Sequence, residues 1–536
     1  MLPAFIFYFV LFCLLFLFPA GLLYLVLLFL EHERQLWRRI APEVDPLARW
    51  LARRGGLDAL RMHFPRATRA LLHRLTLRDP FGLPATVTLL LIGIGAWALL
   101  RVLRGLASGD PLAILDLRLH NAVPLFRTSD ITRFMLFITE LGSPVTLALL
   151  CCGFALLALS RKKARLAASF VLAIGASSLI SVVLKALVHS PRPSDAIVTA
   201  HEASFPSGHF LTAVVVYGWI AGLLLGGRLR DGMRAVAAPL LMILVGLIGL
   251  SRLYLGVHWP SDLLGSLAVA LMVLSALFFF YYAKPIAWLD TFQLPEGRGA
   301  ARVAGYGALV LTLIAPMVLY GRTTLLPGAS PAPNKALESL SSALPAALSP
   351  WSEDLTGGRM EPVSMVLVGS ADQLNEAFAH AGWTRADPPT PVLLLKEGIA
   401  ALRNDPDPSG PATPAFFMNQ PQSYTFEKPD LGAPTIRRRH HARVWRTDAC
   451  LNPDCRPVWV ATASFDVGME LSKPLHLPTH RIDPAIDHER AFVAGELGKV
   501  GATRDGMLAI AGPQRNKNAA GDPFWTDGNA VVMRMP

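Results

Sequence analysis

Three polar clusters lie between long apolar stretches of this sequence, within residues 185–262. They contain basic, imidazole, hydroxyl or carboxyl side chains, and the first two also contain proline or glycine: Lys185, Arg192 and Pro193; Pro206, Ser207, Gly208 and His209; Ser251, Arg252, His258 and Asp262. Ionisable side chains at the ends of membrane-length apolar segments are costly to desolvate, and they mark functional sites. We therefore expect the three clusters to form a single site.

The residue types in these clusters suit the cleavage of a phosphate ester. That reaction needs cationic donors for the non-bridging oxygens, a nucleophile for phosphorus and an acid for the leaving oxygen. Lys185, Arg192 and Arg252 are suitable donors. Ser207 and the Gly208 amide precede a predicted helix, whose N-terminal dipole favours an anion.

The two histidines differ in their sequence neighbours. Asp262 follows His258 by one helical turn, so its carboxylate can hold the imidazole in one tautomer. A neutral imidazole is a good nucleophile toward phosphorus. His209 has no carboxylate at such spacing and suits the general acid, which would later activate water. We therefore expect His258 to be the nucleophile.

The composition is typical of a membrane protein with an additional polar domain. Hydrophobic residues make up 52% of the 536-residue chain and charged residues only 17%, whereas soluble domains average about 25% charged residues. The net charge of +11 agrees with basic cytoplasmic loops. No sequence pattern of a nucleic-acid-binding module is present, so we expect no nucleic-acid partner.

Eight apolar segments are long enough to cross a bilayer: 3–30, 83–103, 131–159, 166–187, 209–225, 235–253, 260–282 and 303–320. Gly142-Ser143-Pro144 interrupts the third of these segments, and residues 104–130 contain a candidate interfacial helix. If the amino end lies outside, every basic loop falls in the cytoplasm, in agreement with the positive-inside rule. The three clusters and everything after residue 320 then fall on the outer side.

The predicted fold class is an all-α polytopic membrane core followed by a soluble α+β domain. We expect a transmembrane helix at 1–30, a basic cytoplasmic amphipathic segment at 31–80, a six-helix core at 81–282, a cytoplasmic loop and an eighth span at 283–320, a linker at 321–358 and an extracytoplasmic domain at 359–536. In that domain, PVSMVLVG, HARVWR and VWVATASFDVG have strand patterns, whereas SADQLNEAFAHAGW and PAIDHERAFVAGELGKVG have helix patterns.

Cysteine usage differs between the two parts of the chain. Cys13, Cys151 and Cys152 lie in apolar segments and are expected to be inert. Cys450 and Cys455 lie in a polar region, where an extracytoplasmic location would favour a disulfide.

The clusters resemble the motif of the type 2 phosphatidic acid phosphatase superfamily. That motif is Lys, six residues, Arg-Pro; Pro-Ser-Gly-His; and Ser-Arg, five residues, His, three residues, Asp, and this sequence matches all eleven specified positions. The resemblance covers roughly residues 83–282 and implies a six-helix membrane lipid phosphatase core with no metal or other cofactor. It implies a catalytic role for His258, Asp262 and His209, phosphate binding by Lys185, Arg192, Ser207, Gly208 and Arg252, and a structural motif role for Pro193, Pro206 and Ser251. As a structural alternative, lysine and arginine side chains at helix ends often extend toward the membrane interface. This would explain Lys185 alone, but it would not explain all the motif residues in their observed order.

The C-terminal domain is similar to the LssY-type domain that follows such cores in bacteria, through VGSADQLNEAFAHAGW, HARVWR and HRIDPAIDHERAF. The acidic and histidine residues of the last stretch suggest either a metal or second catalytic site or, more simply, a capped and solvated helix start. The basic run at 437–441 suggests contact with anionic groups or, more simply, a solvated strand edge.

The resulting hypothesis is a multi-pass lipid phosphatase of the bacterial inner membrane, with its site and C-terminal domain on the periplasmic side. Undecaprenyl pyrophosphate is the first candidate substrate, and phosphatidylglycerol phosphate, phosphatidic acid and lipid A phosphate stay open. A phosphotransferase with the same phosphohistidine and a non-enzymatic lipid-binding or transport protein are the alternatives, whereas a haloperoxidase is disfavoured. The expected partners are the lipid substrate and the bilayer. A homo-oligomer and another envelope component bound by the C-terminal domain are also considered.

Overall fold

The computed structural model describes residues 62–66, 74, 81–108, 111–200, 202–226, 231–282, 298–323, 325–326, 335–340, 348–355, 357–387, 414–430, 438–471 and 478–536. The predicted first transmembrane helix and nearly all of the basic segment lie outside these residues. The chain divides into two compact units. We name them the membrane unit, which contains residues 81–108 and 128–326, and the C-terminal unit, which contains residues 111–127 and 335–536.

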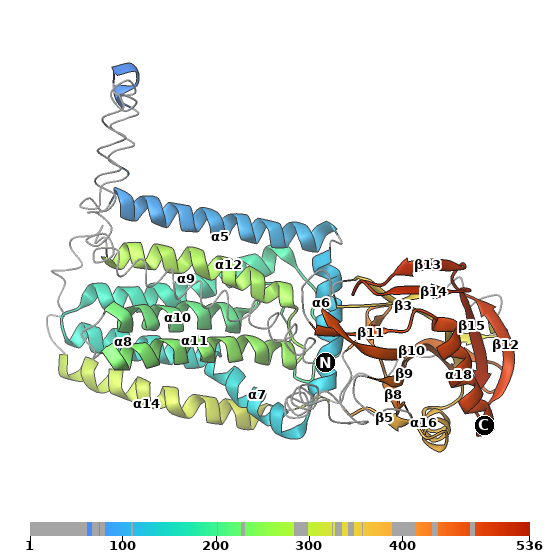
Figure 1. Cartoon of the computed structure of the whole chain (residues 1–536). Coiled ribbons are helices and arrows are strands. Elements are labelled where there is room, and N and C mark those ends of the chain that lie inside the picture. Colours follow the sequence, from blue (N-terminus) through green and yellow to red (C-terminus); the bar gives the residue numbers. More distant parts are fainter. Residues whose placement is uncertain are drawn as a thin grey trace. The chain divides into compact units, whose positions relative to one another are not determined.

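The membrane unit is a bundle of apolar helices (Figure 1): α5 (Leu83–Ser108), α7 (Ser129–Leu141), α8 (Pro144–Ser160), α9 (Ala164–Val188), α10 (Gly208–Gly226), α11 (Asp231–Tyr254), α12 (Pro260–Tyr282) and α14 (Arg298–Arg322). Among the described residues, six of these helices are long and apolar enough to cross a bilayer, and the bent pair α7 and α8 makes a seventh candidate. This pattern confirms the predicted polytopic, all-helical core.

The break between α7 and α8 follows from the local sequence. Pro144 cannot donate a backbone hydrogen bond to a preceding turn, and Ser143 caps α8 by accepting from the Thr146 amide at 3.3 Å. Gly142 brings the chain close to α11, because a Cβ there would lie 2.5 Å from Ile248 Cγ2. The two helix axes are bent by 42° at this point.

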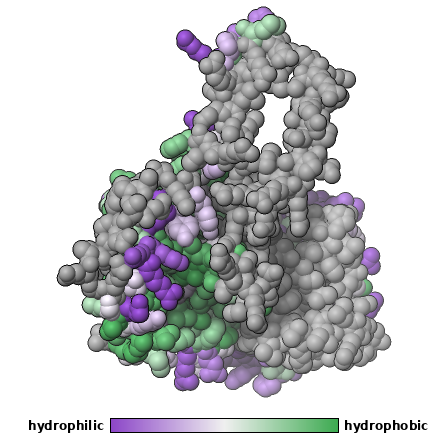
Figure 2. Space-filling view, turned by 90° about the vertical axis from the view of Figure 1, so that its left-hand side faces the viewer, coloured by the Kyte–Doolittle hydropathy of each residue, from purple (hydrophilic) through white to green (hydrophobic). Residues whose placement is uncertain are grey.

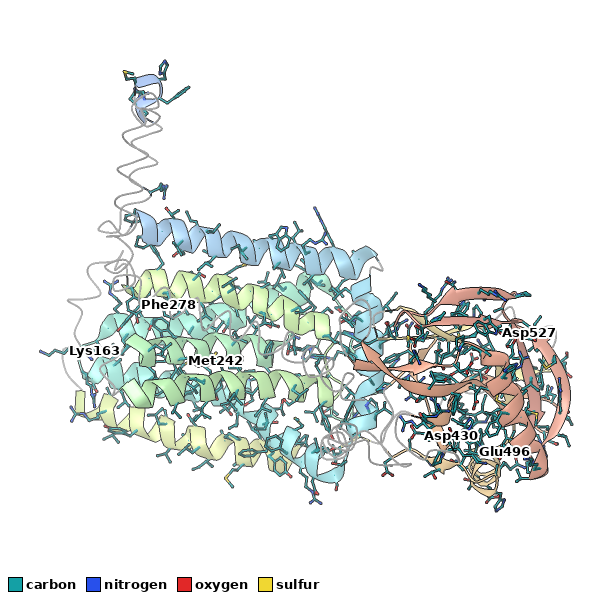
Figure 3. All side chains as sticks on the ribbon, viewed as in Figure 1. Lys163, Met242, Phe278, Asp430, Glu496 and Asp527 are labelled. Atoms are coloured by element: carbon teal, nitrogen blue, oxygen red, sulfur yellow. A yellow bond between two sulfur atoms is a disulfide. The ribbon has the colours of Figure 1, made fainter. Side chains whose placement is uncertain are left out.

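Helix α10 lies at the centre of the bundle. Of its span 72% is buried, compared with 17% of the span of α5, whose apolar side chains are left to contact lipid. Its Trp219 packs edge-on against Phe278 of α12 at a ring distance of 5.0 Å; Phe278 is labelled in Figure 3. Buried aromatic and aliphatic side chains therefore join the helices that carry the polar clusters.

The two ends of the bundle carry different groups. The turn before α9 exposes Arg161, Lys162 and Lys163, and Lys163 lies at one end of the bundle (Figure 3). A view onto that end shows hydrophilic side chains beside the hydrophobic flanks of the helices (Figure 2). Helix α9 runs from this basic turn to Lys185, so the polar clusters lie at the opposite end.

The C-terminal unit is built around a nine-stranded mixed sheet. Its main path runs β12-β15-β4-β10-β9-β8-β5, while β1 pairs with β9 and β11 pairs with β10. The strands are β1 (Lys335–Leu337), β4 (Met365–Val368), β5 (Thr384–Arg385), β8 (Tyr424–Pro429), β9 (Arg439–Leu451), β10 (Arg456–Leu471), β11 (Pro478–Ile482), β12 (Thr503–Ala509) and β15 (Asn529–Arg534).

Two smaller sheets complete the strands of this unit. One has the order β3-β2-β6-β7 and the other pairs β13 with β14. Their bounds are β2 (Trp351–Glu353), β3 (Arg359–Pro362), β6 (Phe416–Phe417), β7 (Gln420–Pro421), β13 (Gln514–Lys517) and β14 (Pro523–Thr526).

Helices α16 (Ala371–His380) and α18 (Ile486–Lys499) pack on one face of the large sheet. The alternation of strand side chains explains this layer: Met365 and Leu367 join the core beneath the helices, whereas Val366 and Val368 join the core on the other face. A capping box formed by Ser370 and Gln373 begins α16. The predicted strands and helices of this domain are therefore present.

Two segments differ from the sequence-based expectations. Residues 321–358 were expected to be a linker, but they contain β1 and β2, which pair with β9 and β3. Strands of three residues leave no periodic pattern in a sequence. The C-terminal unit therefore begins before residue 359.

The second segment is α6 (Pro111–Ala122), followed by the 3₁₀ helix η2 (Val123–Phe126). It was expected to be an interfacial helix, but its apolar side packs with Leu355 and Phe416 of the C-terminal unit. Arg118 donates to Asn419 Oδ1 at 2.9 Å and to the Asp354 carbonyl at 2.7 Å, and it forms an ion pair with Glu353. A segment between two membrane helices is therefore part of the C-terminal fold.

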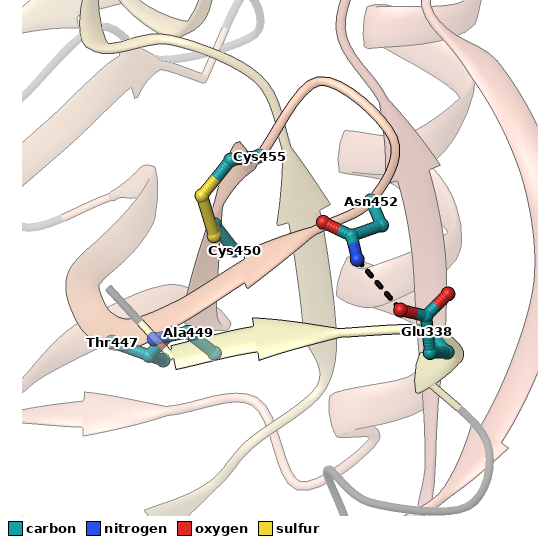
Figure 4. Close-up of a disulfide and its surroundings, with 6 residues drawn as sticks. All are labelled: Glu338, Thr447, Ala449, Cys450, Asn452 and Cys455. Atoms are coloured by element: carbon teal, nitrogen blue, oxygen red, sulfur yellow. Dashed lines mark hydrogen bonds between the residues drawn. A yellow bond between two sulfur atoms is a disulfide. The ribbon is translucent and has the colours of Figure 1, made fainter. Parts of the chain in front are cut away.

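Cys450 and Cys455 are joined by a disulfide that closes the turn between β9 and β10 (Figure 4). In the same turn, Asn452 donates to Glu338 Oε1 at 2.7 Å, next to the end of β1. The disulfide thus closes the turn on itself, and the hydrogen bond connects the turn to the segment that begins the domain.

We predict that Arg118→Ala loosens the attachment of α6. The substitution removes hydrogen bonds and an ion pair from a side chain that is 3% exposed, and hydrogen bonds that involve charged groups each contribute about 1.5–3 kcal/mol. Hydrogen exchange of the purified full-length protein should become faster in α6 and near Asn419. Arg133→Ala is the control, because its ion pair with Asp130 is exposed. Unchanged exchange in Arg118→Ala would contradict this role.

Candidate active site

The structure brings the three polar clusters together at the end of the bundle opposite Lys163. Lys185 lies in the last turn of α9, and His209 lies in the first turn of α10. Arg252 lies in the last turn of α11, and Asp262 lies in the first turn of α12. The loop between α9 and α10 contributes Arg192. Four helix ends, this loop and the turn between α11 and α12, which carries His258, therefore form the site.

His258 and Asp262 form a buried pair. His258 Nδ1 lies 3.0 Å from Asp262 Oδ2, and both side chains are almost inaccessible to solvent. The Trp259 amide donates to the same carboxylate oxygen at 2.9 Å. The other ring nitrogen, His258 Nε2, lies 3.4 Å from Arg192 Nη1. The carboxylate therefore orients the ring so that Nε2 points toward the cationic side of the site.

Ser204 is a third member of this arrangement that the sequence motif does not include. Its hydroxyl donates to Asp262 Oδ2 and lies 3.4 Å from His258 Nδ1. Ser204 is completely buried, and its amide donates to the Ser190 carbonyl at 2.9 Å. The hydroxyl helps to satisfy a buried carboxylate, which would otherwise be costly to desolvate.

The surroundings of His258 favour its neutral form. Burial lowers the pKa of His258 well below its ordinary value, and the positive charges of Arg252, Arg192 and Lys185 lower it further. A neutral ring that donates from Nδ1 to a carboxylate carries its lone pair on Nε2. This is the nitrogen that faces Arg192.

Lys185 and Arg192 also organise the backbone around the site. Lys185 donates to the Ala203 carbonyl and lies 3.6 Å from the Glu202 carboxylate. Arg192 donates from Nε to the Glu202 carbonyl and from Nη1 to the Val257 carbonyl, both at 2.6 Å. Both side chains therefore fix the approach of the loop to the His258 segment.

Ser207 and Arg252 each present a buried polar atom. Ser207 Oγ and Arg252 Nε have no hydrogen-bond partner among the described residues. The Ser207 amide, by contrast, donates to Ser266 Oγ at 3.1 Å. Buried polar groups in folded proteins are paired with few exceptions. Two unpaired donors in one polar site suit an anionic ligand that carries several oxygen atoms.

His209 lies in the field of the same cations. Arg252, His258, Arg192 and Lys185 are the charged or titratable groups that act on it. Among the described residues, no hydrogen bond from its side chain is present. Its position at the start of α10 leaves the imidazole available for a proton transfer within the site.

The remaining motif residues shape the backbone. Pro193 is buried in the loop, and a cis peptide bond joins Phe205 to Pro206. Ser251 Oγ donates to the Ile248 carbonyl at 2.6 Å, within its own helix. Gly208 begins α10, where a Cβ would lie 3.3 Å from Ser181 Oγ.

The C-terminal unit contains a second cluster of titratable side chains. Ser464 Oγ lies 2.6 Å from His441 Nε2, and His441 Nδ1 lies 3.3 Å from Asp466 Oδ1, which resembles a nucleophilic triad. Burial lowers the pKa of His441, but Asp466 and Glu361 more than compensate and raise the pKa to about 9. The neighbouring carboxylates therefore favour the protonated ring, which does not suit the role of a base toward the serine. We interpret this cluster as a buried ion network.

The stretch that suggested a metal or second catalytic site is engaged in other contacts. Asp487 accepts from Thr526 Oγ1 and from the Asp527 amide, both at 2.7 Å. Glu489 lies 2.9 Å from His440 Nδ1. Within the described part of the chain, no three His, Cys, Asp or Glu side chains are grouped as a metal site would require.

The chain leaves the membrane unit at the same end as the candidate site. After α14, Leu325 forms an antiparallel bridge with Val198, and the Leu326 amide donates to the Ile197 carbonyl at 2.9 Å. Val198 belongs to the loop that carries Arg192. The site loop and the start of the connection to the C-terminal unit are therefore side by side.

Comparisons with known families agree with both resemblances found in the sequence. Residues 166–286 match the model of the PAP2 superfamily, and residues 342–530 match the model of the LssY C-terminus. The two matches confirm a membrane phosphatase-like core followed by an LssY-like domain.

Individual relatives are similar to part of the chain. Phosphatidylglycerophosphatase B of Bacillus subtilis is 34% identical over 106 residues, which is 19% of this chain and 52% of the relative. Decaprenylphosphoryl-5-phosphoribose phosphatase of Mycobacterium tuberculosis is 35% identical over 99 residues, which is 18% of this chain and 49% of the relative. The chain thus spans about half the length of these curated relatives.

A solved structure also matches part of the chain. It is the crystal structure of the first transmembrane PAP2 type phosphatidylglycerolphosphate phosphatase from Bacillus subtilis. The match covers 34% of this chain and 94% of that chain, with 26% sequence identity and a TM-score of 0.32.

We predict that the site binds a tetrahedral oxyanion. Orthovanadate, added to the detergent-solubilised protein at about 100 times its dissociation constant, should stabilise the fold by about 2.7 kcal/mol. A thermal unfolding series would measure this. Arg252→Ala should abolish the shift because it removes an unpaired buried donor, whereas Lys163→Ala, at the opposite end, should preserve it. Equal shifts in both variants would place the anion elsewhere.

Proposed function

We propose that this chain, whose residues 166–286 form a PAP2 superfamily domain, is an integral-membrane enzyme that hydrolyses a lipid phosphate or pyrophosphate. The observation that carries the proposal is the environment of His258. One ring nitrogen is held by a buried carboxylate, and the other faces Arg192. The unpaired donors of Ser207 and Arg252 belong to the same site.

In the first step, His258 Nε2 attacks phosphorus and the bond between phosphorus and the leaving oxygen breaks. His209 gives a proton to that oxygen, so the lipid alcohol or lipid phosphate departs in its protonated form. Asp262 stabilises the imidazole as it gains positive character. Lys185, Arg192, Ser207, Gly208 and Arg252 bind the non-bridging oxygens, whose charge must be stabilised in the transition state.

In the second step, His209 removes a proton from water, and the resulting oxygen nucleophile attacks the phosphohistidine. The bond between nitrogen and phosphorus breaks, inorganic phosphate forms, and the electron pair returns to His258 Nε2. The two steps together consume one water molecule and restore both histidines. The proposed chemistry needs positioning and charge stabilisation from side chains of this chain.

The proposed substrate is a lipid with a terminal phosphate or pyrophosphate, and undecaprenyl pyrophosphate is the first to test. The names of two relatives support a lipid phosphate and describe two lipid types, a phosphatidylglycerol phosphate and a decaprenyl-linked sugar phosphate. The site lies at the ends of apolar helices, where a lipid headgroup meets its acyl or prenyl chain.

The proposed location is the inner membrane of a bacterium, with the site on the periplasmic side. The basic turn at residues 161–163 lies at the bundle end opposite the site, and basic loops favour the cytoplasm. A disulfide in the C-terminal unit agrees with an oxidising compartment. The chain leaves the bundle at the site's end, and we propose the periplasm for the C-terminal unit as well.

We expect His258→Ala to abolish phosphate release, since no other residue of the site replaces a nucleophile that is oriented by a carboxylate. Wild-type protein would first be assayed for released phosphate across undecaprenyl pyrophosphate, phosphatidylglycerol phosphate, phosphatidic acid and lipid A phosphate. His380→Ala, on an exposed part of α16, is the control. Full activity in folded His258→Ala, or no hydrolysis of any lipid by the wild type, would reject the proposal.

The proposed orientation predicts the labelling of single cysteines in a cysteine-free background. Ser194→Cys, exposed in the site loop, should react with a membrane-impermeant maleimide in intact spheroplasts. Lys162→Cys, at the opposite end, should react only after the membrane is permeabilised. The reverse pattern would invert the orientation.

A further inference from the structure

One face of α7, together with its N-cap residue Thr128, holds the last turn of α11. Thr132 Oγ1 lies 2.8 Å from Tyr254 Oη, and the Thr128 amide donates to the same hydroxyl at 3.2 Å. Two turns further along, Thr139 Oγ1 accepts a hydrogen bond from Arg252 Nη1 at 2.7 Å. The spacing of these threonines places them on one side of a helix.

The contact between Thr139 and Arg252 is buried. Thr139 is 3% exposed and Arg252 is 7% exposed. Solvent therefore cannot replace a hydrogen bond lost from the guanidinium, and a buried donor left unpaired is costly. The guanidinium is held at Nη1, while Nε has no partner among the described residues. Thr139 thus holds Nη1 of the Arg252 guanidinium, and Nε is left to donate to an anion.

The surrounding helices fix Thr139 itself. Gly142, three residues later, permits a close approach to Ile248 of α11, where a Cβ would lie 2.5 Å from Ile248 Cγ2. Tyr217 of α10 donates to the Leu141 carbonyl at 2.8 Å. The end of α7 is therefore attached to α11, which carries Arg252, and to α10, which begins with Gly208 and His209.

We infer that Thr139 is a positioning residue that sets the direction in which the Arg252 guanidinium meets the substrate phosphate. The inference rests on the proposed function for the identity of the ligand. Thr139 precedes residues 166–286, so it lies outside the PAP2 superfamily match and outside the three clusters. The membrane helix before the family match thereby contributes to the phosphate site.

A substitution series separates positioning from simple packing. Thr139→Val keeps the shape and burial of the side chain but removes the acceptor, whereas Thr139→Ser keeps the acceptor. Thr139→Val should lower kcat/KM for the lipid substrate by about 10- to 100-fold, since small displacements of a catalytic group cost about this much. The inhibition constant of orthovanadate should rise in parallel. Thr139→Ser should restore both quantities to within about threefold of the wild type.

The control is Ser169→Ala, which removes a buried hydroxyl whose bond goes to the Leu166 carbonyl of its own helix. It should leave kcat/KM and orthovanadate inhibition unchanged. Thermal unfolding of every variant distinguishes loss of fold from loss of position. If folded Thr139→Val keeps wild-type values, or if Thr139→Ser is impaired as much as Thr139→Val, the positioning role is wrong.

Direct binding of orthovanadate, measured by thermal shift, keeps this test separate from the proposed hydrolysis. If the wild type binds orthovanadate but hydrolyses no lipid, the proposed function fails while the positioning role is still tested. In that case Thr139→Val should weaken orthovanadate binding, and Thr139→Ser should preserve it. Equal binding by the wild type and both variants would overturn the inference.

Discussion

The carboxylate of Asp262 is the group on which the organisation of the site depends. Its Oδ2 atom accepts from His258 Nδ1, from the Trp259 amide and from the Ser204 hydroxyl. These donors come from the turn between α11 and α12, which carries His258 and Trp259, and from the loop before α10, which carries Ser204. A buried carboxylate is stable only when it is satisfied in this way, so the same interactions that stabilise the charge also bring the segments together.

The cationic residues of the site are also held by hydrogen bonds to other segments of the membrane unit. Lys185 and Arg192 bind backbone carbonyls at residues 202, 203 and 257, and Arg252 is held by Thr139 of α7. These three cations, close together, would repel one another without such acceptors. Backbone carbonyls and a threonine hydroxyl supply partial negative charge to Arg192 and Arg252 without neutralising them, so the site stays attractive to an anion.

The sequence predicted the parts of the molecule that have a local signal. The spans have continuous apolar composition, and the His258–Asp262 spacing of one helical turn predicted a pair that lies 3.0 Å apart. Ser204 and Thr139 have no such signal, because a single hydroxyl near or within an apolar segment usually bonds to its own backbone. The attachment of α6 was also missed, since Arg118 and Asn419 are 301 residues apart, and the sequence pattern of a helix does not identify a distant partner.

That separation has a consequence for the order of synthesis. Helix α6 leaves the ribosome before its binding partners exist, and at about 5–20 residues per second the 301 residues to Asn419 take about 15–60 s. During this interval Leu115 and Leu119 have not yet met Leu355 and Phe416. The surface of the bilayer is the nearest apolar environment for a helix between two membrane spans. The nascent chain would thus use α6 first as a membrane-surface helix and only later as a part of the C-terminal fold.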